Sequence, residues 1–105
     1  MLNRVYGGCK SICADARPFH PAEYEAARTF LNSLERKKGI NRRWSSYSLK
    51  HLAEKIAGRY VSNEALIAAA EDLGFRVFSL GGPNRWFNIS ERSIREKAIA
   101  AGWRL

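Results

Sequence analysis

The chain has 105 residues and a mass of 11.9 kDa, with 18 Lys and Arg against 10 Asp and Glu, so its net charge is +8. This length suits one domain with one core, because domains typically hold about 100–150 residues. No apolar run approaches the roughly 20 residues of a membrane helix. We therefore expect a single domain over 1–105, and neither a large multidomain enzyme nor a membrane protein.

The first 19 residues show no clear periodicity and form the less regular part of the predicted domain. Gly7-Gly8 interrupts this segment, and a short strand could form at Arg4–Tyr6. The N-terminus lacks the apolar stretch of a secretory signal, so the expected location is the cytoplasm.

The cysteines and histidines raise the question of a metal site. They are Cys9, Cys13, His20 and His51. Four such ligands would complete a tetrahedral zinc site. The intervals of three, six and thirty residues between them do not match a compact zinc finger. We therefore expect free thiols in a reducing compartment, with no metal and no other cofactor.

The first helix is predicted over Ala22–Lys38. Pro21 suits its first turn, where a backbone N–H needs no partner. Arg36, Lys37 and Lys38 suit the negative end of the helix dipole, and Gly39 suits the position after the last turn. The apolar stripe of this helix comprises Tyr24, Ala27, Leu31 and Leu34.

A connector over 40–47, which could hold a short strand, leads to two further helices. Ser48 is the expected N-cap of a helix over Leu49–Ala57, and Ser62 that of a helix over Asn63–Leu73. The inner face of the first of these is expected to comprise Leu49, Leu52, Ala53 and Ile56.

The pattern then changes to that of a β-hairpin. Strands are predicted over 75–80 and 85–89, separated by the turn cluster Gly81–Asn84. Trp86 and Phe87 are adjacent in the second strand and should point to opposite faces, so that one of them is less buried. Ser90 is the expected N-cap of a last helix over 91–101, after which Trp103 can fold back on the core.

This order of elements indicates an α+β domain of the winged helix-turn-helix type, with the hairpin as the wing. In that fold the third helix would enter the major groove of DNA. Here its outward positions include Glu64, Glu71 and Asp72, and it has no Lys or Arg. Repulsion between these carboxylates and the phosphates opposes groove reading by this helix.

The positive charge is concentrated in one segment. Residues 36–59 hold eight Lys and Arg against Glu54 alone, a net charge of +7. Such a block is a candidate contact for phosphates or for an acidic protein surface, although a solvated loop would have the same composition. With two cations of the hairpin, the candidate binding residues are Arg36, Lys37, Lys38, Arg42, Arg43, Lys50, Lys55, Arg59, Arg76 and Arg85.

Aromatic residues are interleaved with these cations. Trp44, Tyr47 and Tyr60 could stack on the bases of a single strand. We favour a structural interpretation for two of them, in which Trp44 and Tyr47 pack the first helix onto the second.

Catalytic motifs are lacking in this sequence. It has no nucleophile elbow, no phosphate-binding glycine loop and no HExxH. Glu71 and Asp72 are adjacent and therefore do not share a helix face as a carboxylate pair would. We expect a protein that is not an enzyme.

The middle of the chain carries a resemblance. The stretches Ser46–His51, Gly58–Asn63 and Ala65–Ala70, within residues 46–75, resemble a segment of small uncharacterised proteins of phages and proteobacterial mobile elements. The resemblance implies that the protein comes from a phage or a mobile element, and it assigns no site residue. Small proteins of this kind include transcriptional regulators and inhibitors of host defence, anti-CRISPR proteins among them.

Two functions follow as expectations. The first is a small basic protein of a mobile element that binds DNA or RNA through the cationic segment. The second is an inhibitor of the anti-CRISPR type that binds a host effector protein and blocks its activity or its binding of nucleic acid.

Overall fold

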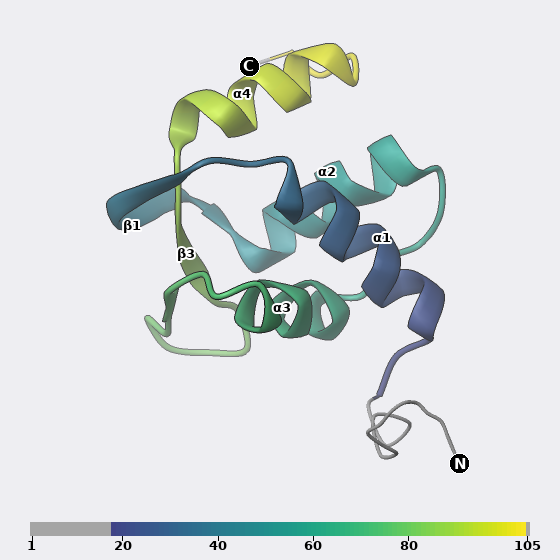
Figure 1. Ribbon diagram of the computed structural model, residues 1–105, viewed down its shortest axis with the longest axis horizontal. Helices are drawn as coiled ribbons and strands as arrows, with labels where there is room; N and C mark the ends of the chain where they lie inside the picture. Colours follow the sequence, from purple (N-terminus) through teal and green to yellow (C-terminus); the bar gives the residue numbers. More distant parts are fainter. Residues whose placement is uncertain (1–17, 105) are drawn as a thin grey trace.

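Helices and strands are interspersed along the chain in the computed structural model, which describes residues 18–104. They form a small α+β domain with four helices and a three-stranded antiparallel sheet. The elements are α1 (Pro21–Asn32), β1 (Arg36–Ser45), α2 (Ser46–Ala57), α3 (Asn63–Asp72), β2 (Val77–Phe78), β3 (Trp86–Ile89) and α4 (Glu91–Ala100). In Figure 1, α1, α2 and α3 gather beside the sheet, and α4 lies at the opposite end of the molecule from α3. The strand expected at Arg4–Tyr6 falls outside the described residues.

The first helix is shorter than predicted. It begins as expected, with Pro21 in its first turn and the ring Nδ1 of His20 accepting a hydrogen bond from the Ala22 N–H at 3.0 Å. It ends at Asn32, and the Ser33 hydroxyl donates to the Phe30 carbonyl at 2.6 Å. The extension of this helix to Lys38 was wrong, because residues 36–38 belong to a strand.

That strand, β1, takes the place of the expected connector. It runs antiparallel to β3, pairing Arg36 with Ile89 and Ser45 with Trp86, and the strand order of the sheet is β1-β3-β2. The register shifts twice along this pair, so β1 is irregular. The Asn88 side chain donates to the Lys37 carbonyl at 3.1 Å and helps to hold the cationic end of β1 on the sheet.

Serine caps determine where the remaining helices begin. The hydroxyls of Ser62 and Ser90 accept hydrogen bonds from backbone N–H groups in the first turns of α3 and α4, as predicted. α2 starts three residues earlier than expected, because its N-cap is Ser45, whose hydroxyl accepts from the Ser48 N–H at 3.3 Å. α2 ends at Ala57, and its C-cap is Gly58, which has a φ of 70°.

The core lies where α1, α2 and α3 meet the inner face of the sheet. Its largest fully buried side chains are Leu31, Leu49, Leu52, Val61, Leu66, Phe87, Ile89 and Ile94. Phe87 is buried while Trp86 is only half-buried, as expected for this pair, although Asn88 and Ile89 are buried as well. Ile56, by contrast, is 48% exposed and does not belong to the inner face of α2. Within residues 18–104 no helix is long and apolar enough to cross a membrane.

Candidate functional site

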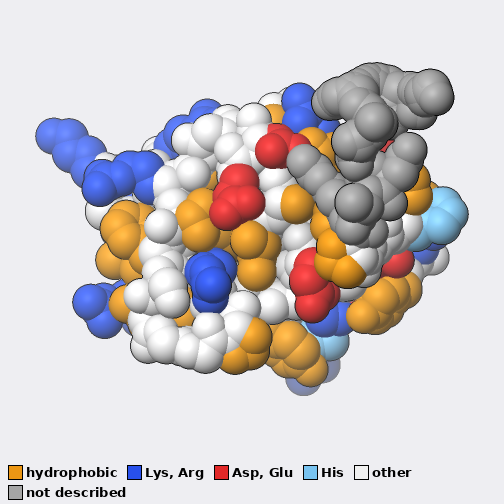
Figure 2. Space-filling model, turned by 90° about the horizontal axis from the view of Figure 1, so that it is seen from below, with side chains coloured by type: hydrophobic (Ala, Val, Ile, Leu, Met, Phe, Trp, Pro, Cys, Tyr) orange, Lys and Arg blue, Asp and Glu red, His pale blue; other side chains and the backbone are white. Residues whose placement is uncertain are grey.

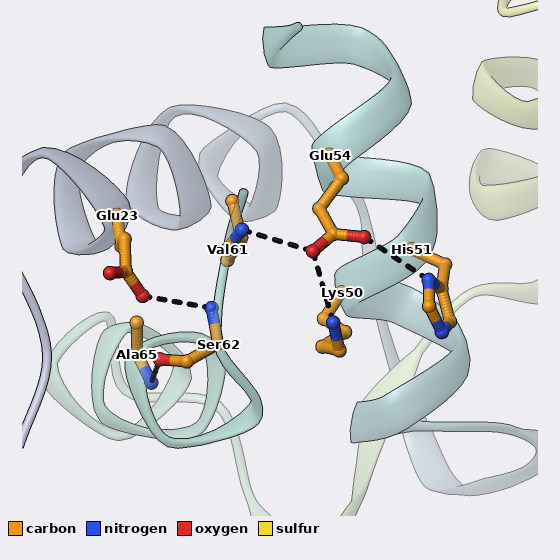
Figure 3. Close-up of polar contacts among 7 residues, drawn as sticks. All are labelled: Glu23, Lys50, His51, Glu54, Val61, Ser62 and Ala65. Atoms are coloured by element: carbon orange, nitrogen blue, oxygen red, sulfur yellow. Dashed lines mark hydrogen bonds and ion pairs between the residues drawn. The ribbon is translucent and has the colours of Figure 1, made fainter. Parts of the chain in front are cut away.

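The turn between α2 and α3 is held by a carboxylate of α2. One oxygen of Glu54 accepts from the Lys50 ammonium at 3.0 Å and from the buried Val61 N–H at 3.1 Å (Figure 3). The other oxygen is 3.1 Å from Nδ1 of His51. Burial raises the pKa of Glu54, but the hydrogen bonds from Lys50, Val61 and His51 outweigh it, so the pKa lies below its usual value. The negative charge of Glu54 is thus compensated by groups of the protein itself.

A second carboxylate holds the next residue of the same turn. Glu23 of α1 accepts from the Ser62 N–H at 3.0 Å with one oxygen (Figure 3). Its other oxygen accepts from the His20 N–H at 3.4 Å. Burial raises the pKa of Glu23, whereas the hydrogen bonds from Ser62 and His20 lower it and prevail. Together, Glu23 and Glu54 fix the backbone from which Arg59 and Tyr60 project.

A groove lies beside this turn. It has a volume of about 990 Å³ and is bounded by the end of β1, one side of α2, the α2–α3 turn and the C-terminal Trp103. We call it the α2 groove. Its cationic lining consists of Arg43, Lys55 and Arg59. All three are exposed.

The rings of the α2 groove are of two kinds. Trp44 stacks on Trp103 with ring centroids 6.2 Å apart and 17° between the planes, and its indole N–H donates to Glu91 at 3.2 Å. Tyr47 and Tyr60 are instead 50% and 63% exposed. The structural interpretation is therefore wrong for Tyr47, which is exposed and lines the groove, whereas Trp44 packs against the core and on Trp103.

Four of the ten candidate cations are already engaged by the fold. Arg36 lies 4.3 Å over the Phe75 ring and donates to the Leu73 carbonyl. Lys50 is buried, forms an ion pair with Glu54, and has its ammonium 4.7 Å from the Tyr60 ring centroid.

Two hairpin cations complete this engaged group. Arg76 donates to the Lys38 carbonyl at 3.3 Å and lies 5.3 Å over the Phe78 ring. Arg85 donates to two carbonyls of its own turn, those of Gly82 and Asn84, each at 3.0 Å.

The other six candidates are exposed: Lys37, Lys38, Arg42, Arg43, Lys55 and Arg59. The ion pairs seen within residues 18–104 are Lys50–Glu54, His51–Glu54 and Arg92–Glu96, and none of these involves the six. We call them the free cations. Four of them stand on β1, on either side of Asn41, which pairs with Phe87 of β3.

The structure separates the free cations from the acidic helix. On α3, Glu64 and Glu71 are exposed, and Asp72 accepts a hydrogen bond from the Tyr24 hydroxyl at 2.6 Å. Figure 2 views the molecule from the side of α3: Asp and Glu side chains lie within this face beside Lys or Arg, and further Lys and Arg side chains project at its left edge, the side on which β1 bends back in Figure 1.

The histidines lie in different settings. His20 uses its ring nitrogen to cap α1, and His51 pairs with Glu54 on α2. Cys9 and Cys13 fall outside the described residues. Over the part of the chain that is described, no group of three or more His, Cys, Asp or Glu side chains is arranged to hold a metal ion.

Sequence reasoning identified the free cations but not the α2 groove. Trp103 completes the groove from a position 59 residues away from Trp44, and no local pattern links the two. The alternation of cations with Trp44, Tyr47 and Tyr60 was the signal of the groove that the sequence offered.

Comparisons with protein-family models, curated proteins and solved structures found no significant match to this chain.

Proposed function

We propose that this chain is a small, non-enzymatic, cytoplasmic protein of a phage or mobile element that binds nucleic acid. The observation that carries the proposal is the set of six free cations, which lack a carboxylate partner among the described residues. Lys and Arg that are not neutralised internally can displace the counterions of a phosphate backbone, which is the main source of sequence-independent affinity.

We also propose that the domain is of the winged helix-turn-helix type. The order of α1, β1, α2, α3, β2 and β3 supports this assignment, as does the pairing of β1 with the hairpin strand β3. A five-residue turn, Gly58–Ser62, joins the helix pair α2 and α3. The wing is short, since β2 has two residues.

The proposed contact does not use α3. Glu64 and Glu71 are seven positions apart and therefore lie on the same side of the helix, where they would face the phosphates in a groove-reading pose. The free cations of β1 and of the α2 groove carry positive charge, which attracts the phosphates. We therefore assign the contact to β1 and the α2 groove.

The test is a salt titration of binding by fluorescence anisotropy, with a labelled duplex and its labelled single strand. Replacing Arg42 and Arg43 by Gln should reduce the slope of log K against log salt by about 0.7–0.9 for each phosphate that the variant no longer neutralises. The matched control is Arg92→Gln with Arg95→Gln, which removes the same charge from exposed positions of α4. Absence of binding to both ligands at low salt would overturn the proposal.

A second candidate function is favoured by the exposed carboxylates of α3. Glu64 and Glu71 could occupy the phosphate-binding groove of a host effector, in the manner of an anti-CRISPR inhibitor. Cells that carry an active CRISPR locus and express this chain should then tolerate a targeted plasmid, and Glu64→Lys with Glu71→Lys should abolish that tolerance. Unchanged plasmid loss in the presence of the wild-type chain would count against this candidate.

A further inference from the structure

We propose that the α2 groove binds a single strand of DNA or RNA, with unpaired bases stacked on Tyr47 and Tyr60. This inference rests on the proposed nucleic-acid binding and specifies its ligand. The two rings are 50% and 63% exposed, and both line one groove with the free cations Arg43, Lys55 and Arg59. An aromatic platform with cations beside it is the arrangement by which single-strand-binding proteins hold bases and backbone together.

Both tyrosines are held in place before any ligand arrives. The Lys50 ammonium lies 4.7 Å from the ring centroid of Tyr60 and 5.6 Å from that of Tyr47, within the range of cation–π attraction. The Tyr47 ring also meets His51 edge-on, with centroids 4.6 Å apart. Lys50 is in turn fixed by Glu54 at 3.0 Å. Rings with restricted rotamers lose little entropy on binding, which favours affinity.

The charge of the groove suits a phosphate backbone. Its carboxylate, Glu54, is occupied by Lys50, His51 and the Val61 N–H, so it does not oppose the three free cations of the lining. A peptide with acidic side chains would satisfy these cations equally well, but it would not need two exposed ring faces beside them.

The rings favour a single strand over a duplex. The bases of a duplex are already stacked on one another and present only their edges, whereas those of a single strand have free faces that can stack on a side chain. A single nucleotide would use only one of the two rings. The pair of tyrosines and the spread of cations from Arg43 to Arg59 therefore point to a strand of several nucleotides.

The experiment measures anisotropy with a labelled oligothymidylate of about 12 nucleotides, a length within the span that such grooves cover. Three further ligands are compared with this strand. They are the duplex that it forms with oligoadenylate, an oligouridylate of the same length, and thymidine monophosphate as a competitor. The variants are Tyr47→Leu and Tyr60→Leu. Phe78→Leu on β2 is the control, because it removes a half-buried ring that also lies beside an arginine. Far-UV circular dichroism checks that each variant folds.

We expect the single strand to bind more tightly than the duplex, and each tyrosine variant to weaken its binding about fivefold or more. The salt slope should stay unchanged, since no charge is removed. Tyr47→Phe and Tyr60→Phe should retain affinity, and Phe78→Leu should have no effect. Comparison of the oligothymidylate with the oligouridylate tells which sugar the groove prefers.

The outcomes separate this inference from the proposed function. Equal affinity for the duplex, insensitivity to both leucine variants, or competition by the mononucleotide as strong as that by the strand would overturn the stacking site while leaving nucleic-acid binding intact. Failure of every nucleic acid to bind at low salt would overturn both.

Discussion

Glu54 receives three groups at its two carboxylate oxygens: Lys50, His51 and the Val61 N–H. Replacing it with Gln removes the charge that compensates the buried Lys50 ammonium. We expect Glu54→Gln to lower the free energy of unfolding by about 1–2 kcal/mol, measured by urea denaturation. Glu96→Gln is the control: its partner Arg92 is 86% exposed, and such surface pairs contribute less than about 1 kcal/mol. An equal decrease in the two variants would contradict the role assigned to Glu54.

The same carboxylates give the fold a dependence on acid. The pKa values of Glu23 and Glu54 lie below the 4.5 of a free glutamate, so the unfolded chain binds protons more readily than the folded one. Their contribution to stability is therefore complete above about pH 4.5 and disappears as the pH falls through their lower folded values. Urea denaturation across this range should show the decline, and Glu23→Gln combined with Glu54→Gln should flatten it. A decline of the same steepness in the double variant would assign it to other groups.

Among the elements, the end of α2 offers a test of backbone conformation. Gly58 has a φ of 70°, a region that side chains rarely adopt, although no atom would contact an added Cβ. We expect Gly58→Ala to cost about 1 kcal/mol of unfolding free energy. Gly39 on β1 is the matched control: it has the same open space without positive φ, so Gly39→Ala should be neutral or slightly stabilising. A similar cost in both variants would contradict the role assigned to the φ of Gly58.

The elements also show which signals in the sequence were sufficient. Ser62 and Ser90 were identified as N-caps, because a serine before an apolar period is a local signal. β1 was missed as a strand at Arg36–Lys38, because exposed cations suit a helix end and an edge strand equally. These residues form a strand because Arg36 pairs with Ile89. This interaction joins distant parts of the chain and leaves no local pattern in the sequence.

Across the whole molecule, charge is divided between the acidic α3 and the cationic β1 and α2. If nucleic acid binds at the α2 groove, Glu64→Gln with Glu71→Gln should leave the affinity unchanged or raise it by a few-fold, through weaker long-range repulsion. The effect should fade as salt is added. Anisotropy at two salt concentrations measures it. Weaker binding in this variant would place α3 at the contact, against the proposed assignment.

The sequence predicted a set of cations for the site, but it did not predict how the fold arranges them. The count of cations in residues 36–59 was correct, but only six of the ten candidates remain free, because residues such as Arg36 and Lys50 are engaged by Phe75 and Glu54. Such engagements depend on tertiary contacts. The α2 groove depends on Trp103, which the sequence places after the last helix with no indication of its partner.

The stacking of Trp44 on Trp103 also has an optical consequence. Two of the three tryptophans of the chain are these stacked indoles, and both line the α2 groove, while Trp86 lies on β3. Indoles stacked at 6.2 Å couple their electronic transitions, so the pair should contribute strongly to the near-ultraviolet circular dichroism, and its emission adds to that of Trp86. A base or any other chromophore that enters the groove should quench that emission, and Trp86→Phe should leave the response unaltered. The protein thus carries a label-free reporter of its own groove.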